Sequence, residues 1–448
     1  MTQAMFDYID AHADAFIARL MDYAKHPAIS AHDVGIREVA GMMVAHLKGL
    51  GFETELIETK GHPFVLGTYR VDPDKPTVLL YGHYDVQPPD PLEEWLSPPF
   101  EPIIRDERIF GRGMADNKGQ HFAQLLAIET HLELTGTLPC NVIFLLEGEE
   151  EIGSPQIADF VAAQRDKLQV DLVVTSDGPL HPSGAPVVTF GVRGVAGFDL
   201  VAKGASRDVH SGNYGGVVPN PIWTLVHLLA TMKDAEGNIT IEGISDVVPP
   251  PSNLDLDAVS RLPDDEAVVK DTLQLDTLDG PKGRPYWDRL MFHPTLTING
   301  IHGGYGGPGT KTVLPNEAFA KCDIRLVNPL TPEIVFDRVQ AHVSRHAPEV
   351  NVVCHHGMYP SKTPLDSRFA APILRAIQLA RGVEPLIYPV MGGSLPDYVF
   401  TQILGKPSFV VPYANADGAN HAPNENIEIA RFIDGIKTGT ALLSELGA

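Results

Sequence analysis

The chain has 448 residues, which at about 150 residues per domain predicts two or three domains. Its 44% hydrophobic and 20% charged residues are typical of a globular protein and exclude a disordered or collagen-like chain. The 34 basic and 57 acidic residues give a net charge of −23, so neither nucleic acids nor anionic membranes are expected as partners.

The cysteines and the N-terminal segment predict a cytoplasmic protein. The three cysteines are Cys140, Cys322 and Cys354. Their odd number and the lack of C-x-x-C spacing fit reduced thiols in a reducing compartment. The N-terminal segment spreads aspartates among its apolar residues and lacks the basic start and apolar centre of a signal peptide. No apolar run approaches the ~18 residues of a membrane span, so no membrane partner is expected.

The chain begins with two predicted amphipathic helices, at residues 5–23 and 34–50. Short apolar runs typical of buried strands then alternate with helical stretches. The runs are 77–82, 141–147, 171–176 and 408–413, and the helices include 117–134 and 368–381. This alternation predicts an α/β domain of three layers, with helices on both faces of a mostly parallel sheet.

A different order of elements predicts a smaller α+β domain inserted in the first. Its expected elements are strands 193–203, 295–299, 318–327 and 349–354, with helices at 221–232 and after Thr331. The acidic, proline-rich segment 234–294 is predicted to form loops and short helices. We therefore expect a larger domain of residues 1–190 and 358–448, interrupted by an inserted domain of residues 191–357.

Polar residues follow the predicted strands, where ligands of an open α/β sheet bind. These candidates are His83, Asp85, Glu149, Glu150, Glu151, Asp177 and His421, with Asp116 at the start of a helix. Singly, each is more typical of a surface or turn residue. Together, two histidines and several carboxylates at one sheet edge suit a pair of divalent ions such as zinc, manganese or cobalt.

Six segments resemble the motifs of the dinuclear zinc exopeptidases and amidohydrolases. They are Gly82-His-Tyr-Asp-Val86, Gly111-Arg-Gly-Met-Ala-Asp-Asn-Lys-Gly119, Glu147-Gly-Glu-Glu-Glu-Ile-Gly-Ser154, Ser176-Asp177, Asp208-Val-His-Ser-Gly212 and His421-Ala-Pro-Asn-Glu425. The family includes carnosinase-like dipeptidases, aminoacylases, acetylornithine deacetylase, succinyl-diaminopimelate desuccinylase and glutamate carboxypeptidase. The resemblance covers nearly the whole chain and implies that the inserted domain is a ferredoxin-like lid and dimerisation domain.

The resemblance implies that each chain binds two divalent ions, zinc first, with manganese or cobalt as alternatives. His83, Asp116 and Asp177 would hold one ion, and Asp116, Glu151 and His421 the other. Asp116 would thus bridge the two ions. Asp85 would hydrogen-bond the far nitrogen of His83 and fix its tautomer. Glu150 would be the general base, taking a proton from water and delivering it to the leaving amine.

The resemblance also implies four contacts with the substrate. His210 would stabilise the oxyanion in the active site of a neighbouring subunit, which predicts a homodimer. Arg325 would bind the substrate's free carboxylate with its planar fork. Thr312 and Ser394 match substrate-contacting positions of the carnosinase-like branch. Without the resemblance, Arg325 is an exposed strand charge and the other three are loop or turn residues.

The predicted activity is hydrolysis of an amide bond next to a free carboxylate, in small peptides such as dipeptides. N-acyl amino acids are the alternative substrates, because Met391 stands where the carnosinase-like branch often has an acidic residue for the amine. Gln120 is a second departure, since many relatives have proline there. A binding protein without catalysis is disfavoured by the presence of Glu150, His210 and all five ligands. A two-metal phosphoesterase is disfavoured because Arg325 is the one basic residue at a matched site.

Overall fold

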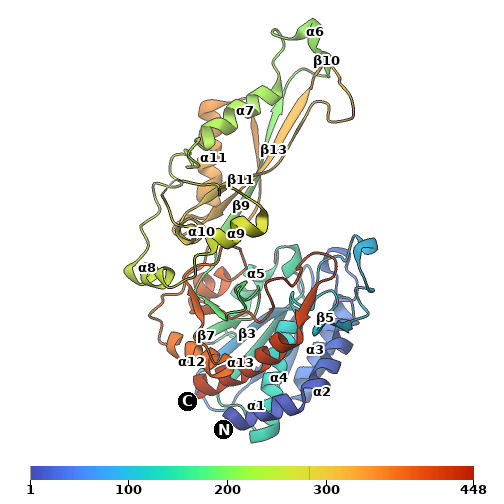
Figure 1. The fold of residues 1–448 in the computed structure, drawn as a ribbon, viewed down its shortest axis with the longest axis vertical. Helices are drawn as coiled ribbons and strands as arrows, with labels where there is room; N and C mark the ends of the chain where they lie inside the picture. The colour runs from blue at the N-terminus through green and yellow to red at the C-terminus, as the bar shows by residue number, and fades with distance from the viewer. Residues whose placement is uncertain (1, 282) are drawn as a thin grey trace. The chain divides into compact units, whose positions relative to one another are not determined.

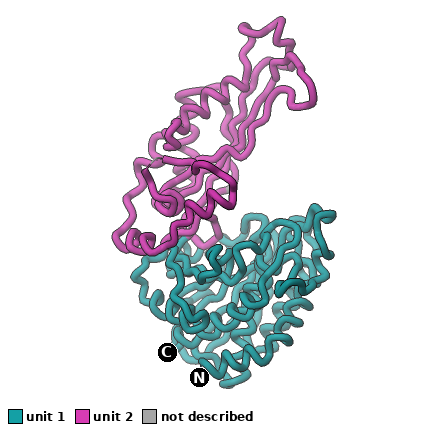
Figure 2. Tube along the Cα trace, viewed as in Figure 1, with its two compact units in different colours: residues 1–191, 363–388, 399–448 teal, residues 192–362, 389–398 magenta. Residues whose placement is uncertain are grey.

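The computed structural model describes residues 2–281 and 283–448 and divides into two compact units (Figure 2). Unit 1 comprises Met1–Gly191, Thr363–Tyr388 and Val399–Ala448, and unit 2 comprises Val192–Lys362 and Pro389–Tyr398. Each unit has a hydrophobic core of its own. The short stretch Pro389–Tyr398, which carries Ser394, belongs to unit 2 although it lies late in the sequence.

Unit 1 is built on an eight-stranded sheet with the order β1-β2-β6-β3-β7-β16-β8-β15 (Figure 1). The strands are β1 (Glu53–Ile57), β2 (Phe64–Tyr69), β3 (Thr77–His83), β6 (Asn141–Glu147), β7 (Leu172–Thr175), β8 (Val187–Thr189), β15 (Leu386–Tyr388) and β16 (Ser408–Val410). The four central strands β6, β3, β7 and β16 run parallel. Antiparallel pairs extend the sheet through β2 and β1 on one side and through β8 on the other. The predicted large sheet with a parallel centre is confirmed.

Helices cover both faces of this sheet. The helices of unit 1 are α1 (Thr2–Ala11), α2 (Ala13–Ala24), α3 (Ile36–Gly49), α4 (Lys118–Thr135), α5 (Ile157–Ala163), α12 (Ala370–Arg381) and α13 (Ile429–Gly447). On one face, Leu80 shares a core with residues of α4 and α13. On the other, Phe64 stacks on Phe160 of α5 with ring centroids 3.9 Å apart, and Tyr81 packs against Phe400. Successive side chains of a strand point to opposite faces of the sheet, so consecutive residues of β3 pack against the helices on opposite faces.

Two smaller features complete unit 1. The single helix predicted over residues 5–23 is in fact α1 and α2, separated at His12. The His12 ring stacks on Tyr8 and its Nδ1 lies 2.8 Å from the Tyr8 carbonyl oxygen, with His12 itself at φ −109° and ψ 10°. A three-stranded sheet joins β4 (Ile103–Arg105), β5 (Arg108–Phe110) and β17 (Asn426–Glu428). It brings the segment that follows His421 beside the loop that leads to Asp116.

Unit 2 contains a four-stranded antiparallel sheet with the order β11-β13-β9-β14. Its strands are β9 (Gly194–Lys203), β11 (Thr295–Gly303), β13 (Glu317–Leu326) and β14 (Asn351–Met358), and its two long helices are α7 (Pro221–Met232) and α11 (Pro332–His346). Residues alternate between buried and partly exposed along β9, because α7 and α11 cover one face. The βαββαβ chain order with this strand order is the ferredoxin-like pattern that we predicted.

Shorter elements surround this core. The acidic segment contains α8 (Asn253–Ser260), α9 (Asp265–Leu273) and α10 (Tyr286–Phe292). A small ribbon pairs β10 (Val209–His210) with β12 (Val313–Leu314), next to α6 (Ser211–Tyr214). Among the residues that the structure describes, no helix combines the length and the apolar character needed to cross a membrane.

Candidate functional site

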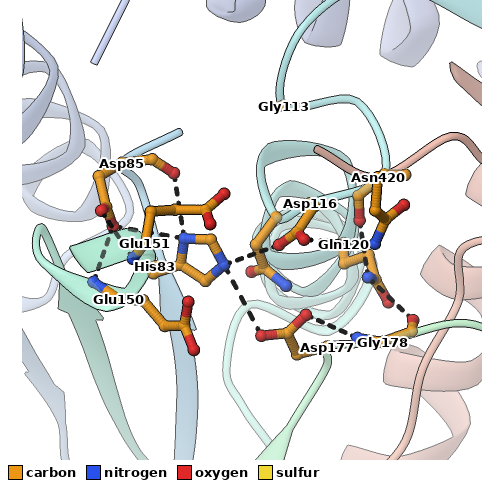
Figure 3. A network of polar contacts seen from close by, with 12 residues as sticks. His83, Asp85, Gly113, Asp116, Gln120, Glu150, Glu151, Asp177, Gly178 and Asn420 are labelled. Atoms are coloured by element: carbon orange, nitrogen blue, oxygen red, sulfur yellow. Dashed lines mark hydrogen bonds and ion pairs between the residues drawn. The ribbon is translucent and has the colours of Figure 1, made fainter. Parts of the chain in front are cut away.

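The candidate metal ligands of unit 1 meet beyond the carboxyl ends of the central strands (Figure 3). His83 is the last residue of β3 and pairs in register with Glu147, the last residue of β6. Asp177 follows β7, which is the other neighbour of β3. The ends of three parallel strands therefore deliver these side chains to one edge of the sheet.

Asp116 lies between the two histidines. Its Oδ1 is 3.0 Å from Nε2 of His83, and its Oδ2 is 3.2 Å from Nε2 of His421. Asp177 Oδ2 lies 3.6 Å from the same nitrogen of His83, and Glu151 Oε2 lies 3.0 Å from Nε2 of His421. The structure thus brings together all five residues expected to hold metal. Because each oxygen of Asp116 faces a different histidine, its carboxylate can serve two ions at once.

The protonation of this cluster follows from burial and from its own charges. Burial raises the pKa of Asp177 to about 7, and the charge of Asp116 adds to the shift. Burial would also raise the pKa of Asp116, but hydrogen bonds with His421 and His83 outweigh it and lower that pKa. Hydrogen bonds with Asp116 and Glu151 raise the pKa of His421 to about 10. Burial lowers the pKa of His83, yet hydrogen bonds with Asp116 and Asp85 leave it well above its usual value.

The donor set fits divalent cations. His83, Asp116 and Glu151 each offer one ligand atom within 4.8 Å of the others. In the described part of the chain, no lysine or arginine forms an ion pair with Asp116, Glu151 or Asp177, so protonated histidines are their only partners of opposite charge. Metal binding requires neutral imidazole and ionised carboxylate, so a divalent cation would replace these protons.

Asp85 connects a candidate ligand to the candidate base. Its side chain is completely buried, and its Oδ1 lies 3.3 Å from Nδ1 of His83, which also lies 3.0 Å from the Asp85 carbonyl oxygen. The same carboxylate accepts the backbone N–H groups of Glu150 and Glu151 at 3.2 and 3.1 Å. Burial raises the pKa of Glu150 well above its usual value; the charge of His83 opposes this and those of Asp177 and Asp116 add to it. A carboxylate with a raised pKa is suited to accept a proton.

Glu425 is a completely buried carboxylate that was not among the predicted site residues. It accepts a hydrogen bond from Nη1 of Arg112 at 2.7 Å. It also accepts the backbone N–H groups of Gly113, Ala115 and Asp116 at 2.9–3.0 Å. Gly113 has a φ of 86°, and a Cβ there would lie 2.7 Å from Val86 Cγ1, so this turn requires glycine. The position of Glu425 at the end of the motif that begins with His421 was the signal available in the sequence.

The four candidate substrate contacts lie in unit 2 and form two pairs. Nη1 of Arg325 donates a hydrogen bond to Oγ of Ser394 at 2.7 Å. Nearby, Nε of Arg193 donates to the carbonyl oxygen of Gly392 at 2.8 Å. Burial and the charge of Arg325 lower the pKa of Arg193 to about 10. At the β10–β12 ribbon, Oγ1 of Thr312 lies 3.4 Å from Nε2 of His210.

The two pairs lie at opposite ends of the long strands of unit 2. Arg325 is next to the last residue of β13, whereas β12 and the ribbon precede the first residue, Glu317. The ribbon lies beyond that end of the strand (Figure 1). Eight residue steps along β13 separate Glu317 from Arg325. At about 3.4 Å per residue, that separation is ~27 Å, far longer than a dipeptide.

Comparisons with known proteins agree on one family. Residues 79–445 match the sequence profile of Peptidase family M20/M25/M40. The Cys-Gly metallodipeptidase dug1 of Schizosaccharomyces pombe is 32% identical over 472 residues, covering 99% of this chain and 98% of that protein. The Beta-Ala-His dipeptidase of Mus musculus is 30% identical over 473 residues, covering 100% and 96%.

A solved structure gives the same answer. The M20 family metallo-carboxypeptidase Sso-CP2 from Sulfolobus solfataricus superimposes with a TM-score of 0.89 at 33% identity. The match covers 96% of this chain and 99% of that one. The family profile, the relatives that match over nearly their full length and the similar solved structure agree. The chain belongs to peptidase family M20/M25/M40.

Proposed function

We propose that the protein is a metal-dependent dipeptidase that cleaves the peptide bond next to a free carboxylate. The observation that carries this proposal is the position of Asp116 between His83 and His421, with Glu150 beside them. The relatives named Cys-Gly metallodipeptidase and Beta-Ala-His dipeptidase span nearly the whole chain and favour dipeptides over N-acyl amino acids. The neighbour named metallo-carboxypeptidase is compatible with cleavage next to a free carboxylate.

The proposal includes two divalent ions per chain, zinc first, with manganese or cobalt as alternatives. His83, Asp116 and Asp177 would hold one ion, and Asp116, Glu151 and His421 the other. When bound, such ions polarise a carbonyl oxygen and lower the pKa of a coordinated water. Imidazole and carboxylate are ligands that all three metals accept, so the donor set agrees with each of them.

The chain's own residues would handle protons and orientation. Glu150 would take the proton of the attacking water and pass it to the leaving amine, since its raised pKa favours the protonated form once the proton is gained. Asp85 would keep Nδ1 of His83 protonated, so that Nε2 is free to bind metal. The same carboxylate holds the backbone of Glu150, which fixes where the base lies.

Unit 2 would supply the substrate contacts. Arg325 carries a planar fork suited to a carboxylate, and its bond to Ser394 leaves further N–H groups to donate. Ser394 would hold that fork in place or share the carboxylate. His210 and Thr312 lie together and would face the oxyanion of the substrate.

A homodimer is part of the proposal, with unit 2 as its lid and dimerisation domain. Since ~27 Å separates the Arg325 end of β13 from the His210 end, one chain cannot offer both groups to one dipeptide. In a two-fold dimer, each chain would lend its His210 to the other. Exposed apolar side chains on α7 and on edge strand β11 suit such an interface; they are Trp223 (60% exposed), Val226 (39%), Ile298 (48%) and Ile301 (55%).

We also propose a cytoplasmic location, on the ground of the thiols. Cys140 and Cys322 are buried and free, and Cys354 is free and partly buried. A reducing compartment keeps thiols in this state.

A hydrolysis screen tests the proposed activity. Purified protein would be supplied with zinc, manganese or cobalt and offered dipeptides, tripeptides and N-acetyl, N-succinyl and N-carbamoyl amino acids. We expect the highest kcat/KM with dipeptides. A higher kcat/KM for an N-acyl amino acid would show that the protein is a deacylase and not a dipeptidase. The absence of any hydrolysis by metal-loaded protein would contradict both activities.

A further inference from the structure

Gln120 is a completely buried polar residue near the start of α4, four positions after Asp116. It is not among the candidate ligands, and a buried amide is costly unless its donors and acceptors are paired. The side chain nevertheless points into the loops that carry the metal ligands (Figure 3).

All four hydrogen-bonding positions of the Gln120 amide are used by backbone groups. Its Nε2 donates to the carbonyl oxygen of Ala115 at 2.7 Å and to that of Gly178 at 3.2 Å. Its Oε1 accepts the backbone N–H of Tyr413 at 2.7 Å and that of Ala414 at 3.4 Å. An amide has two N–H donors and two lone pairs, so the set is complete. The two carbonyls on one side and the two N–H groups on the other also fix which end is nitrogen.

The bonded residues adjoin the candidate ligands. Ala115 immediately precedes Asp116, and Gly178 immediately follows Asp177. Tyr413 and Ala414 lie in the segment that leads from β16 toward His421. One side chain thus joins three chain segments, next to the bond that Nδ2 of Asn117 donates to the Ser176 carbonyl oxygen.

We propose that Gln120 is a positioning residue of the metal centre, which sets the spacing of Asp116 and Asp177 through their neighbouring carbonyls. This inference rests on the metal centre proposed above. Two carboxylates that share an ion must be held close together against their mutual repulsion, and donors fixed to both backbones oppose their separation.

Gln124 provides a matched control. It lies one turn farther along α4, is 1% exposed, and donates from Nε2 to the side-chain Oγ of Ser176 at 2.6 Å. It is the same residue type on the same helix and equally buried, but its bond goes to the side-chain hydroxyl of the residue before Asp177 and does not hold a backbone group. Replacing either glutamine by methionine keeps the length of the side chain and removes the hydrogen bonds.

The test compares the wild type, Gln120→Met and Gln124→Met, each as the full chain. Zinc affinity would be measured by competition with a chromophoric chelator, and ligand geometry by the visible absorption of Co²⁺ in the substituted protein. We expect Gln120→Met to bind zinc ~10–100-fold more weakly, the range found for groups that support metal ligands, and to show an altered cobalt spectrum. Gln124→Met should keep the wild-type affinity and spectrum.

Four outcomes would overturn the proposal or its basis. If Gln120→Met keeps the wild-type zinc affinity and cobalt spectrum, Gln120 does not position the ligands. If Gln124→Met loses as much zinc affinity as Gln120→Met, the loss comes from removing any buried amide of α4. No metal uptake by the wild type would overturn the metal centre itself. If Gln120→Met does not fold, Gln120→Asn serves instead, because it keeps a neutral amide but is one methylene shorter and cannot reach all four backbone groups. Unchanged zinc affinity in that variant would also contradict the proposed role of Gln120.

Discussion

The carboxylate of Asp85 lies 3.3 Å from Nδ1 of His83, and neither side chain is exposed. Asp85 also accepts the backbone N–H groups of Glu150 and Glu151. One buried carboxylate therefore fixes the orientation of a candidate ligand and the turn that carries the candidate base. Changes at Asp85 should affect metal binding and turnover together.

Asp85→Asn should weaken metal binding by ~10–100-fold, because an amide has one acceptor oxygen where the carboxylate has two, and lacks the negative charge that favours a proton on Nδ1 of His83. Chelator competition would measure the affinity. Asp171→Asn is the matched control, since Asp171 accepts the backbone N–H of Thr77 at the opposite end of β3. Equal metal affinity in both variants would contradict the role of Asp85.

Glu150→Gln should lower kcat by ~10²–10⁴-fold while metal content stays at the wild-type level, because glutamine cannot take a proton. Turnover and metal analysis on the same preparation would separate the two quantities. Glu149→Gln is the control, because the Oε1 that receives the His62 backbone N–H remains an acceptor in glutamine. Near-normal turnover in Glu150→Gln with metal bound would show that another residue is the general base.

Arg325→Lys should reduce kcat/KM for dipeptides ~10–100-fold, which corresponds to the about 1.5–3 kcal/mol of a hydrogen bond to a charged group. Dipeptide amides should lose much less, because lysine cannot reproduce the fork that binds a carboxylate. Steady-state kinetics on both substrate series would measure the difference. Arg345→Lys, at an exposed arginine paired with Glu242, should change neither series. Equal losses on acids and amides would count against carboxylate recognition by Arg325.

Glu150→Ala and His210→Ala chains should each be nearly inactive alone and recover activity when mixed. In a mixed dimer with shared sites, one site holds both intact residues. Random exchange makes half of the dimers mixed, so about a quarter of the wild-type activity should return. Subunit exchange would be verified with differently tagged chains. No recovery after exchange would place His210 in the site of its own chain.

Glu129→Gln should destabilise unit 1 at neutral pH but not in acid. Arg19 donates to both carboxylate oxygens of Glu129 at 2.6 Å, and Nε2 of His46 lies 2.7 Å away. Burial raises the pKa of Glu129, but these hydrogen bonds outweigh it and lower the pKa from 4.5 to about 2.

The folded pKa of Glu129 lies below the unfolded one, so its contribution is present above pH 4.5 and is lost as the pH falls toward 2. Allowing for solvent screening, the contribution to the free energy of unfolding is about 1–2 kcal/mol. Urea unfolding of both proteins from pH 7 to pH 3 would measure it. If the difference in free energy of unfolding between the wild type and Glu129→Gln stays constant from pH 7 to pH 3, the stabilising role of ionised Glu129 is refuted.

Local patterns in the sequence were enough to predict the central strands of the sheet and the polar residues that follow them. Hydrophobic runs and helix start signals are local, so β3, β6 and α7 were predicted within a residue or two of their observed ends. The expected proximity of the candidate ligands followed from one general property of parallel sheets, namely that the carboxyl ends of their strands share an edge. The two-residue strands of the ribbon were missed, because so short a pair has no periodicity to read.

The residues that support the site from distant parts of the chain could be recognised only in the folded protein. Glu425 binds the loop of Asp116 across 310 sequence positions, and Gln120 reaches Tyr413 across 293. Neither residue belongs to a pattern that local periodicity could reveal. The separation of Arg325 from His210 also depended on the register of β9 and β13. Such pairings result from how elements pack, and packing joins residues by shape and by hydrogen-bond geometry, whatever their distance along the chain.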